Sequence, residues 1–111
     1  MDRERREYSR VEISWPVIII SSKGLIDGEV KNICFEGALI RCSELADVDE
    51  TLELNTVIPE QDYLSISAGV EIVWSRTLEG EDRSHTRYDL GVRFVEISEE
   101  DLQLLSNTVL Y

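Results

Sequence analysis

The chain has 111 residues, of which 42% are hydrophobic and 31% are charged, and its formal net charge is −12. This composition is typical of one soluble globular domain, and the longest aliphatic run, residues 17–20, is far too short to span a membrane. Between Arg41 and Arg76 every charged side chain is acidic. Such a field repels nucleic-acid phosphates, so we expect no binding to DNA or RNA. The acidic residues of this stretch are Glu44, Asp47, Asp49, Glu50, Glu53, Glu60, Asp62 and Glu71.

The N-terminal sequence Met-Asp-Arg-Glu-Arg-Arg carries charges with no apolar segment behind them. A secretory signal needs such a segment, so none is expected, and we predict a cytoplasmic location. In that compartment Cys34 and Cys42 are expected to be free thiols, with a disulfide as the less favoured alternative. Neither cysteine has Cys or His neighbours at ligand spacing, so we expect no metal site and no cofactor.

Residues 1–10 are polar and show no hydrophobic period, which predicts a flexible Arg-rich arm, and residues 11–111 are expected to form a single domain. Apolar and polar residues alternate over residues 11–21, as in a strand with one buried face. Proline lacks an N–H donor, so Pro16 predicts an edge position or a bulge. A turn at residues 22–24 leads into the next strand, and the two strands are expected to form a hairpin.

The same alternation predicts the remaining strands. In chain order we expect strands at residues 25–33, 38–42, 51–58, 63–76 and 85–95, with an acidic loop at 43–50, a turn at 59–62 and a charged loop at 78–83. The strand at 63–76 is either one long strand or two strands joined at Gly69, because glycine inside a strand often marks a bulge or a sharp bend.

The last residues have a helical pattern. Ser98 is a good N-cap, and Asp101 three residues later resembles a capping box with Asp in place of Glu. Leu102, Leu105 and Val109 repeat at helical spacing, which predicts a short C-terminal helix. Short antiparallel strands with one terminal helix predict an all-β protein, a closed or nearly closed β-barrel against which that helix packs.

Three arginines, Arg5, Arg6 and Arg10, lie within six residues of an otherwise acidic chain. Taken alone, such a cluster is also typical of a solvated tail. A small basic arm on an acidic body nevertheless indicates a local site for an anion, because solubility does not require it.

About two dozen residues further on, the motif Asn32-x-Cys34-x-x-Gly37 ends an apolar run. Glycine permits the backbone to turn there or to approach a ligand closely. Arg6-x-x-x-Arg10 followed at this separation by Asn32-x-Cys34-x-x-Gly37 resembles the PilZ domain family. The family's serine is replaced here by Cys34.

Residues 88–94, Tyr-Asp-Leu-Gly-Val-Arg-Phe, lead into residues 97–101 and are similar to the closing strand and terminal helix of that family. The resemblance covers nearly the whole chain and implies a six-stranded antiparallel β-barrel, in agreement with the strand count. It also implies a receptor for cyclic di-GMP and not an enzyme. His85, the one histidine, lies beside a serine, but proximity in sequence does not make a hydrolase site.

The resemblance also implies the roles of the site residues. It assigns base and phosphate contacts to Arg6, Arg10, Asn32, Cys34 and Gly37. Arg5, directly before the arginine pair, implies an intercalated, stacked pair of ligand molecules, two cyclic di-GMP per protomer.

The chemistry of these residue types agrees with such a ligand. A guanidinium fork matches O6 and N7 of guanine, and the amide of Asn32 can pair with the N1/N2 edge. Strand alternation is expected to place Asn32 and Cys34 on one face, with Ile33 and Phe35 in the core. Because a thiol forms only weak hydrogen bonds, Cys34 is expected to weaken ligand binding and not to abolish it.

Trp15 and Trp74 alternate with aliphatic residues, so we expect both in the core or packed at a barrel end, not as stacking platforms. The predicted function is a cyclic di-GMP receptor whose arm becomes ordered on binding and signals to an unknown protein partner. The alternative is a ligand-silent PilZ-like adaptor that binds a protein through its acidic face.

Overall fold

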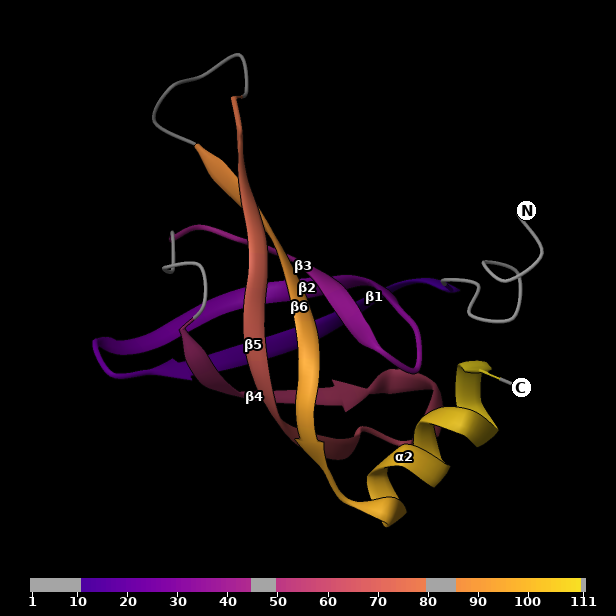
Figure 1. Cartoon of the computed structure of the whole chain (residues 1–111). Coiled ribbons are helices and arrows are strands. Elements are labelled where there is room, and N and C mark those ends of the chain that lie inside the picture. The colour runs from indigo at the N-terminus through magenta and orange to yellow at the C-terminus, as the bar shows by residue number, and fades with distance from the viewer. Residues whose placement is uncertain (1–10, 45–49, 80–85, 111) are drawn as a thin grey trace, which may run out of the picture.

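Six antiparallel strands close into a barrel in the computed structural model, which describes residues 11–44, 50–79 and 86–110. Around the barrel the strand order is β1-β2-β3-β6-β5-β4, and β4 pairs back to β1 (Figure 1). The predicted all-β fold is confirmed, whereas the predicted arm at residues 1–10 and His85 lie outside the described residues. The elements are β1 (Val11–Ser21), β2 (Gly24–Ile33), β3 (Gly37–Cys42), β4 (Thr51–Ile58), η1 (Pro59–Gln61), β5 (Leu64–Leu78), β6 (Arg87–Ile97), α2 (Glu99–Leu105) and η3 (Ser106–Leu110).

Inward-facing side chains from alternate strand positions fill the barrel. In β4 the buried positions are those predicted: Leu52, Leu54, Thr56 and Ile58. Burying an aliphatic side chain of this size stabilises a fold by about 1.5–3 kcal/mol. Thr56, the polar member of the row, donates its hydroxyl to the carbonyl oxygen of Pro16 at 2.7 Å, so its burial leaves no polar atom unpaired.

Pro16 lies where β1 is paired on one side only. It is opposite Glu29 of β2, while the pairing of β1 with β4 begins at Val17. The β1–β2 register also shifts between Glu12 and Trp15. Both observations agree with the edge position or bulge that the missing N–H donor predicted.

β5 is one continuous strand with two irregularities in its pairing to β6. The first register shift, next to Gly69, is the bulge that this glycine predicted. The second, just before Trp74, breaks the period of two, so Val73 and Trp74 both face outward, with 38% of Trp74 exposed. Trp74 therefore does not lie in the core, the first of the two positions expected for it, whereas Trp15 is fully buried as expected.

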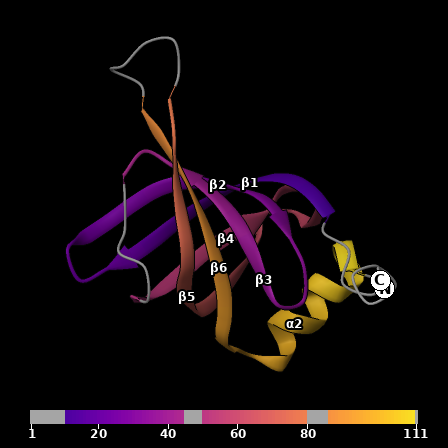
Figure 2. The ribbon, with the colours of Figure 1, turned by 45° about the horizontal axis from the view of Figure 1, so that its top comes forward.

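Helix α2 covers the barrel end at which β6 terminates (Figures 1 and 2). The predicted cap is present, because the Oγ of Ser98 accepts a hydrogen bond from the backbone N–H of Asp101 at 3.0 Å. The Asp101 carboxylate accepts from the backbone N–H of Ser67 at 3.1 Å and so anchors the helix to β5. Leu105 is buried in the barrel core.

The β3–β6 seam is unusually close at Gly37, which is paired with Arg93. A Cβ atom added to Gly37 would lie 1.9 Å from the carbonyl oxygen of Val92, so no side chain fits there. The strands meet at this separation only because residue 37 is glycine.

A fully buried carboxylate, Asp89 of β6, joins three strands. Arg41 of β3 donates from Nε to Oδ1 at 2.9 Å and from Nη2 to Oδ2 at 3.3 Å, and Arg76 of β5 donates from Nη2 to Oδ2 at 3.0 Å. Burial alone would raise the pKa of Asp89, but the hydrogen bonds from both arginines outweigh it and hold the pKa below the ordinary 3.8. The carboxylate therefore remains ionised and ties β6 to its two neighbours.

Replacing Gly37 with alanine should destabilise the protein by about 1–3 kcal/mol, as overpacked sites do, because the Val92 carbonyl must move. Gly69→Ala is the matched control, since its added Cβ would meet nothing closer than the Cβ of Glu96 at 3.5 Å. It should change stability by no more than about 0.5 kcal/mol. Urea unfolding of the two variants measures the difference, and equal stabilities would contradict the close approach at Gly37.

Asp89→Asn should cost about 1.5–3 kcal/mol, the contribution of hydrogen bonds between charged groups. Because the pKa of Asp89 is lowered on folding, its contribution is fully present above the unfolded pKa of about 3.9 and is lost as the pH falls through the folded value. Thermal melting from pH 7 to pH 2.5 should therefore show the wild type approaching the variant in acid. A stability gap that does not change with pH would contradict the ionised clamp.

Candidate functional site

Two backbone hydrogen bonds hold the β2–β3 turn. The N–H of Cys34 donates to the carbonyl of Gly37 at 2.9 Å, and the N–H of Phe94 in β6 donates to the carbonyl of Glu36 at 2.8 Å. The first bond closes the turn and the second attaches it to the neighbouring strand. The turn that carries Cys34 and Gly37 is therefore attached to β6 through the main chain.

The side chains of this turn do not follow the alternation expected from the sequence. Ile33 is buried as expected, but Cys34 is buried as well, and Phe35 is exposed instead of lying in the core. The reason is that β2 ends at Ile33 and that its register with β3 has already shifted before Asn32. A period of two holds only within a regular strand, so it cannot be extended into the turn.

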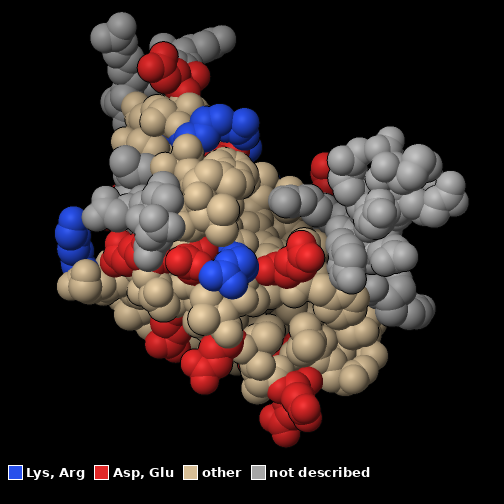
Figure 3. Space-filling view, viewed as in Figure 1, with Lys and Arg blue, Asp and Glu red and all other residues tan. Residues whose placement is uncertain are grey.

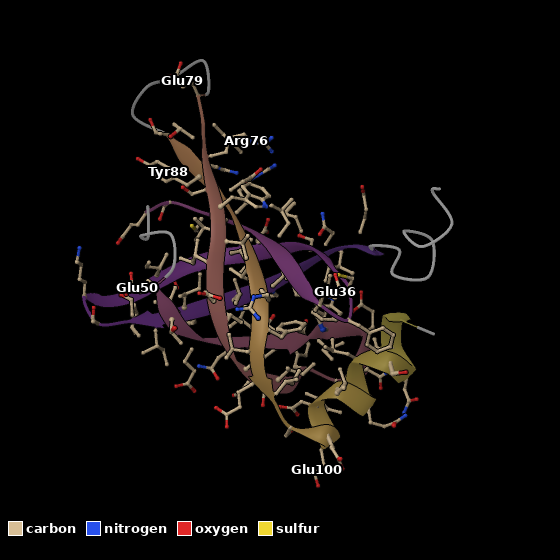
Figure 4. All side chains as sticks on the ribbon, viewed as in Figure 1. Glu36, Glu50, Arg76, Glu79, Tyr88 and Glu100 are labelled. Atoms are coloured by element: carbon tan, nitrogen blue, oxygen red, sulfur yellow. The ribbon has the colours of Figure 1, made fainter. Side chains whose placement is uncertain are left out.

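A hollow of about 230 Å³ opens between this turn and strands β5 and β6. Cys34, Glu36 and Gly37 line it from the turn, and Trp74 and Arg93 line it from the strands. In Figure 4 the labelled Glu36 lies toward the barrel end that α2 covers. The hollow thus combines a thiol, an aromatic ring, one acidic and one basic side chain.

The indole of Trp74 is placed by a second glycine. Trp74 is paired with Gly91, and a Cβ added to Gly91 would lie 2.3 Å from the indole ring. The guanidinium carbon of Arg76 lies 5.6 Å from the ring centroid, a cation–π distance, while the same guanidinium bonds to Asp89. The aromatic wall of the hollow is therefore connected to the buried carboxylate.

Only part of the predicted site can be located. Cys34 and Gly37 come together in the hollow, and Asn32 lies just before them on β2, half-buried and outside the lining. The arginines of the predicted arm lie outside the described residues: Arg5, Arg6 and Arg10.

Trp74 and Arg93 are lining residues that the sequence analysis did not assign to the site. The available signal was Gly91 within an apolar strand, because a glycine there leaves room for an aromatic ring on the facing strand. Arg93 carried no local signal, since its contribution depends on its pairing with Gly37 across the seam.

Arg93 is the basic residue of the lining, and its Nη2 forms an ion pair with Oε1 of Glu71 on β5. Figure 3 shows basic side chains at a few separate places on the face seen in Figure 1, with acidic side chains between them.

The second buried cysteine, Cys42, lies outside the hollow. Burial raises the pKa of its thiol, which donates to the carbonyl of Glu44 at 3.1 Å and stays protonated.

Among the described residues, no group of three or more His, Cys, Asp or Glu side chains is arranged to hold a metal ion. Within the same part of the chain, no helix is long and apolar enough to cross a membrane.

Comparison with solved structures identifies the barrel. The chain superposes on the Bacillus subtilis inhibitor of motility, MotI/DgrA, with a TM-score of 0.70 and 24% identity, over 93% of this chain and 48% of that one. The chain therefore spans about half the length of MotI/DgrA. It also matches the PilZ domain of Escherichia coli YcgR, solved with c-di-GMP, with a TM-score of 0.71 and 13% identity, over 95% of this chain and 88% of that one.

No curated protein sequence matches the chain significantly. The family model of the PilZ domain matches residues 4–110, which is nearly the whole chain. PilZ domains are non-catalytic receptor domains for cyclic di-GMP. The barrel, its terminal helix and this match together establish that the chain belongs to the PilZ domain family.

Proposed function

We propose that this protein is a cyclic di-GMP receptor that binds its ligand at the hollow beside the β2–β3 turn. The observation that carries the proposal is that Cys34 and Gly37, two positions of the family motif, line this hollow together with an aromatic ring. Asn32 is at the end of the neighbouring strand, where its amide can pair with a guanine edge.

The size of the hollow assigns a role to the arm. Pockets that enclose a whole drug-sized ligand have volumes of about 300–1,000 Å³. At about 230 Å³ the hollow is smaller, so it would hold only part of a cyclic dinucleotide. Arg5, Arg6 and Arg10 would cover the remainder, with guanidinium forks matched to guanine and phosphate. Ordering of the arm on the bound ligand would be the change that a protein partner detects.

Trp74 supports the same site. Its indole is half-exposed at the edge of the hollow, and stacking of a base on an aromatic side chain contributes about 1–3 kcal/mol. A guanine held there would have its polar edge near the turn. We therefore place Trp74 in the proposed site, in addition to the residues of the motif. We also propose a cytoplasmic location, in which Cys34 and Cys42 remain the free thiols of this structure.

A ligand-silent adaptor is the second candidate. One row of neighbouring residues on the outer surface of the barrel favours it. Ile20 of β1, Glu53 of β4, Gly69 of β5 and Glu96 of β6 are successive cross-strand neighbours. Ile20, Glu53 and Glu96 are exposed, so the row presents an apolar end and two carboxylates beside a glycine. A basic partner protein would complement such a surface.

Calorimetric titration with cyclic di-GMP tests the receptor proposal. The wild type should bind at micromolar concentration or below, and Arg6→Ala/Arg10→Ala should abolish binding, because each lost bidentate guanine contact costs about 1–3 kcal/mol. A fitted ratio of two ligands per protomer, falling to one in Arg5→Ala, is expected for a stacked pair. No heat and no change in melting temperature at high ligand would favour the adaptor instead.

Cys34→Ser should tighten cyclic di-GMP binding, because a hydroxyl forms a stronger hydrogen bond than a thiol. The expected gain is at most about tenfold, since one hydrogen bond contributes about 0.5–1.5 kcal/mol. Cys42→Ser, the other buried cysteine, is the matched control and lies at the far end of β3. An equal effect of the two substitutions on affinity would contradict a ligand contact at position 34.

A further inference from the structure

We propose that Arg93 is a ligand-binding residue of the hollow and that Glu71 competes with the ligand for its guanidinium. The inference rests on the proposed function, because it concerns the same site. It predicts that Glu71 lowers the affinity for cyclic di-GMP, while other residues of the hollow raise it.

The strand register places Arg93 between its two possible partners. On one side it is paired with Gly37 of β3, and on the other with Glu71 of β5. Gly37 has no side chain, so nothing at that position screens the arginine from a ligand seated at the turn. Arg93 lines the hollow, whereas Glu71 does not. The guanidinium can therefore turn either toward the carboxylate or toward the hollow.

The existing ion pair is suited to exchange. The Arg93 side chain is 59% exposed and Glu71 is 28% exposed, and ion pairs at such positions contribute little to stability. Only Nη2 takes part, while a guanidinium presents five N–H donors in a fixed fork. A phosphate or a guanine edge accepts two of these donors at once, which a single contact with Glu71 does not achieve.

The charges of the hollow and of the ligand predict how the loss of Glu71 changes the affinity for the ligand. Among the described residues that line the hollow, Arg93 and Glu36 are charged, so this part of the lining has no excess positive charge. Cyclic di-GMP carries two phosphates, and every cation released toward it strengthens binding. Removing the charge of Glu71 should free Arg93 and increase affinity, which is the opposite of what a residue that only supports the fold would do.

The experiment is calorimetric titration with cyclic di-GMP of the wild type, Glu71→Gln, Arg93→Met and the double variant. Glu71→Gln should bind about 3- to 10-fold more tightly. Arg93→Met should bind roughly 5- to 150-fold more weakly, the range for one lost bidentate contact. In the Arg93→Met background, Glu71→Gln should have no effect, because the residue it releases is absent.

Glu29→Gln is the matched control. Glu29 is also a glutamate in an exposed ion pair, with Lys31 at 3.4 Å, and it is not part of the hollow. It changes the net charge by the same amount, so its affinity should remain within twofold of the wild type. Melting temperatures of all variants, measured without ligand, separate a loss of folded protein from a loss of binding.

Each outcome supports or overturns the inference. Tighter binding of Glu71→Gln that disappears without Arg93 supports it. An affinity of Glu71→Gln equal to that of Glu29→Gln, or a gain that persists in the Arg93→Met background, overturns it while the receptor function stands. Absence of binding by the wild type overturns the receptor function and this inference together.

Discussion

The closeness of β3 and β6 is the constraint on which both the barrel and its candidate site depend. Gly37 lets β3 approach the Val92 carbonyl, and on the other side of β6 Gly91 makes room for the Trp74 ring. The same contacts close the barrel and form the hollow. A substitution that opened this seam would therefore change the shape of the hollow as well as weaken the barrel.

Positively charged side chains are in short supply in this chain. With a formal net charge of −12, the protein has few cations to use, and most of those described are engaged. Arg41 and Arg76 neutralise the buried Asp89, and Arg93 is paired with Glu71. Among the described residues, few positive charges therefore remain free of acidic partners. With such a net charge, the overall field of the protein repels anions, and attraction could come only from a local arrangement of guanidinium groups.

The regular parts of the fold could be predicted from the sequence because they repeat. Alternation placed β4 and its buried row correctly, and Ser98 marked the start of α2. The errors fall where the repeat is interrupted: at Cys34, where a strand becomes a turn, and at Trp74, which follows a bulge. Register shifts arise from pairing between strands distant in sequence, so, without a local marker such as Gly69, the sequence does not predict them. Cys34 and Gly37 of the predicted motif line the hollow, whereas the sequence pattern did not indicate that Trp74 and Arg93 also line it.

The bulge before Trp74 also gives the protein two indoles in contrasting surroundings. Trp15 is fully buried, with its Nε1 bonded to Glu60 at 3.1 Å, while Trp74 is partly open to water beside the hollow. Small dissolved quenchers reach the second ring and not the first. The intrinsic fluorescence of the chain therefore contains an internal reference and a component that responds to whatever occupies the hollow, without any attached dye.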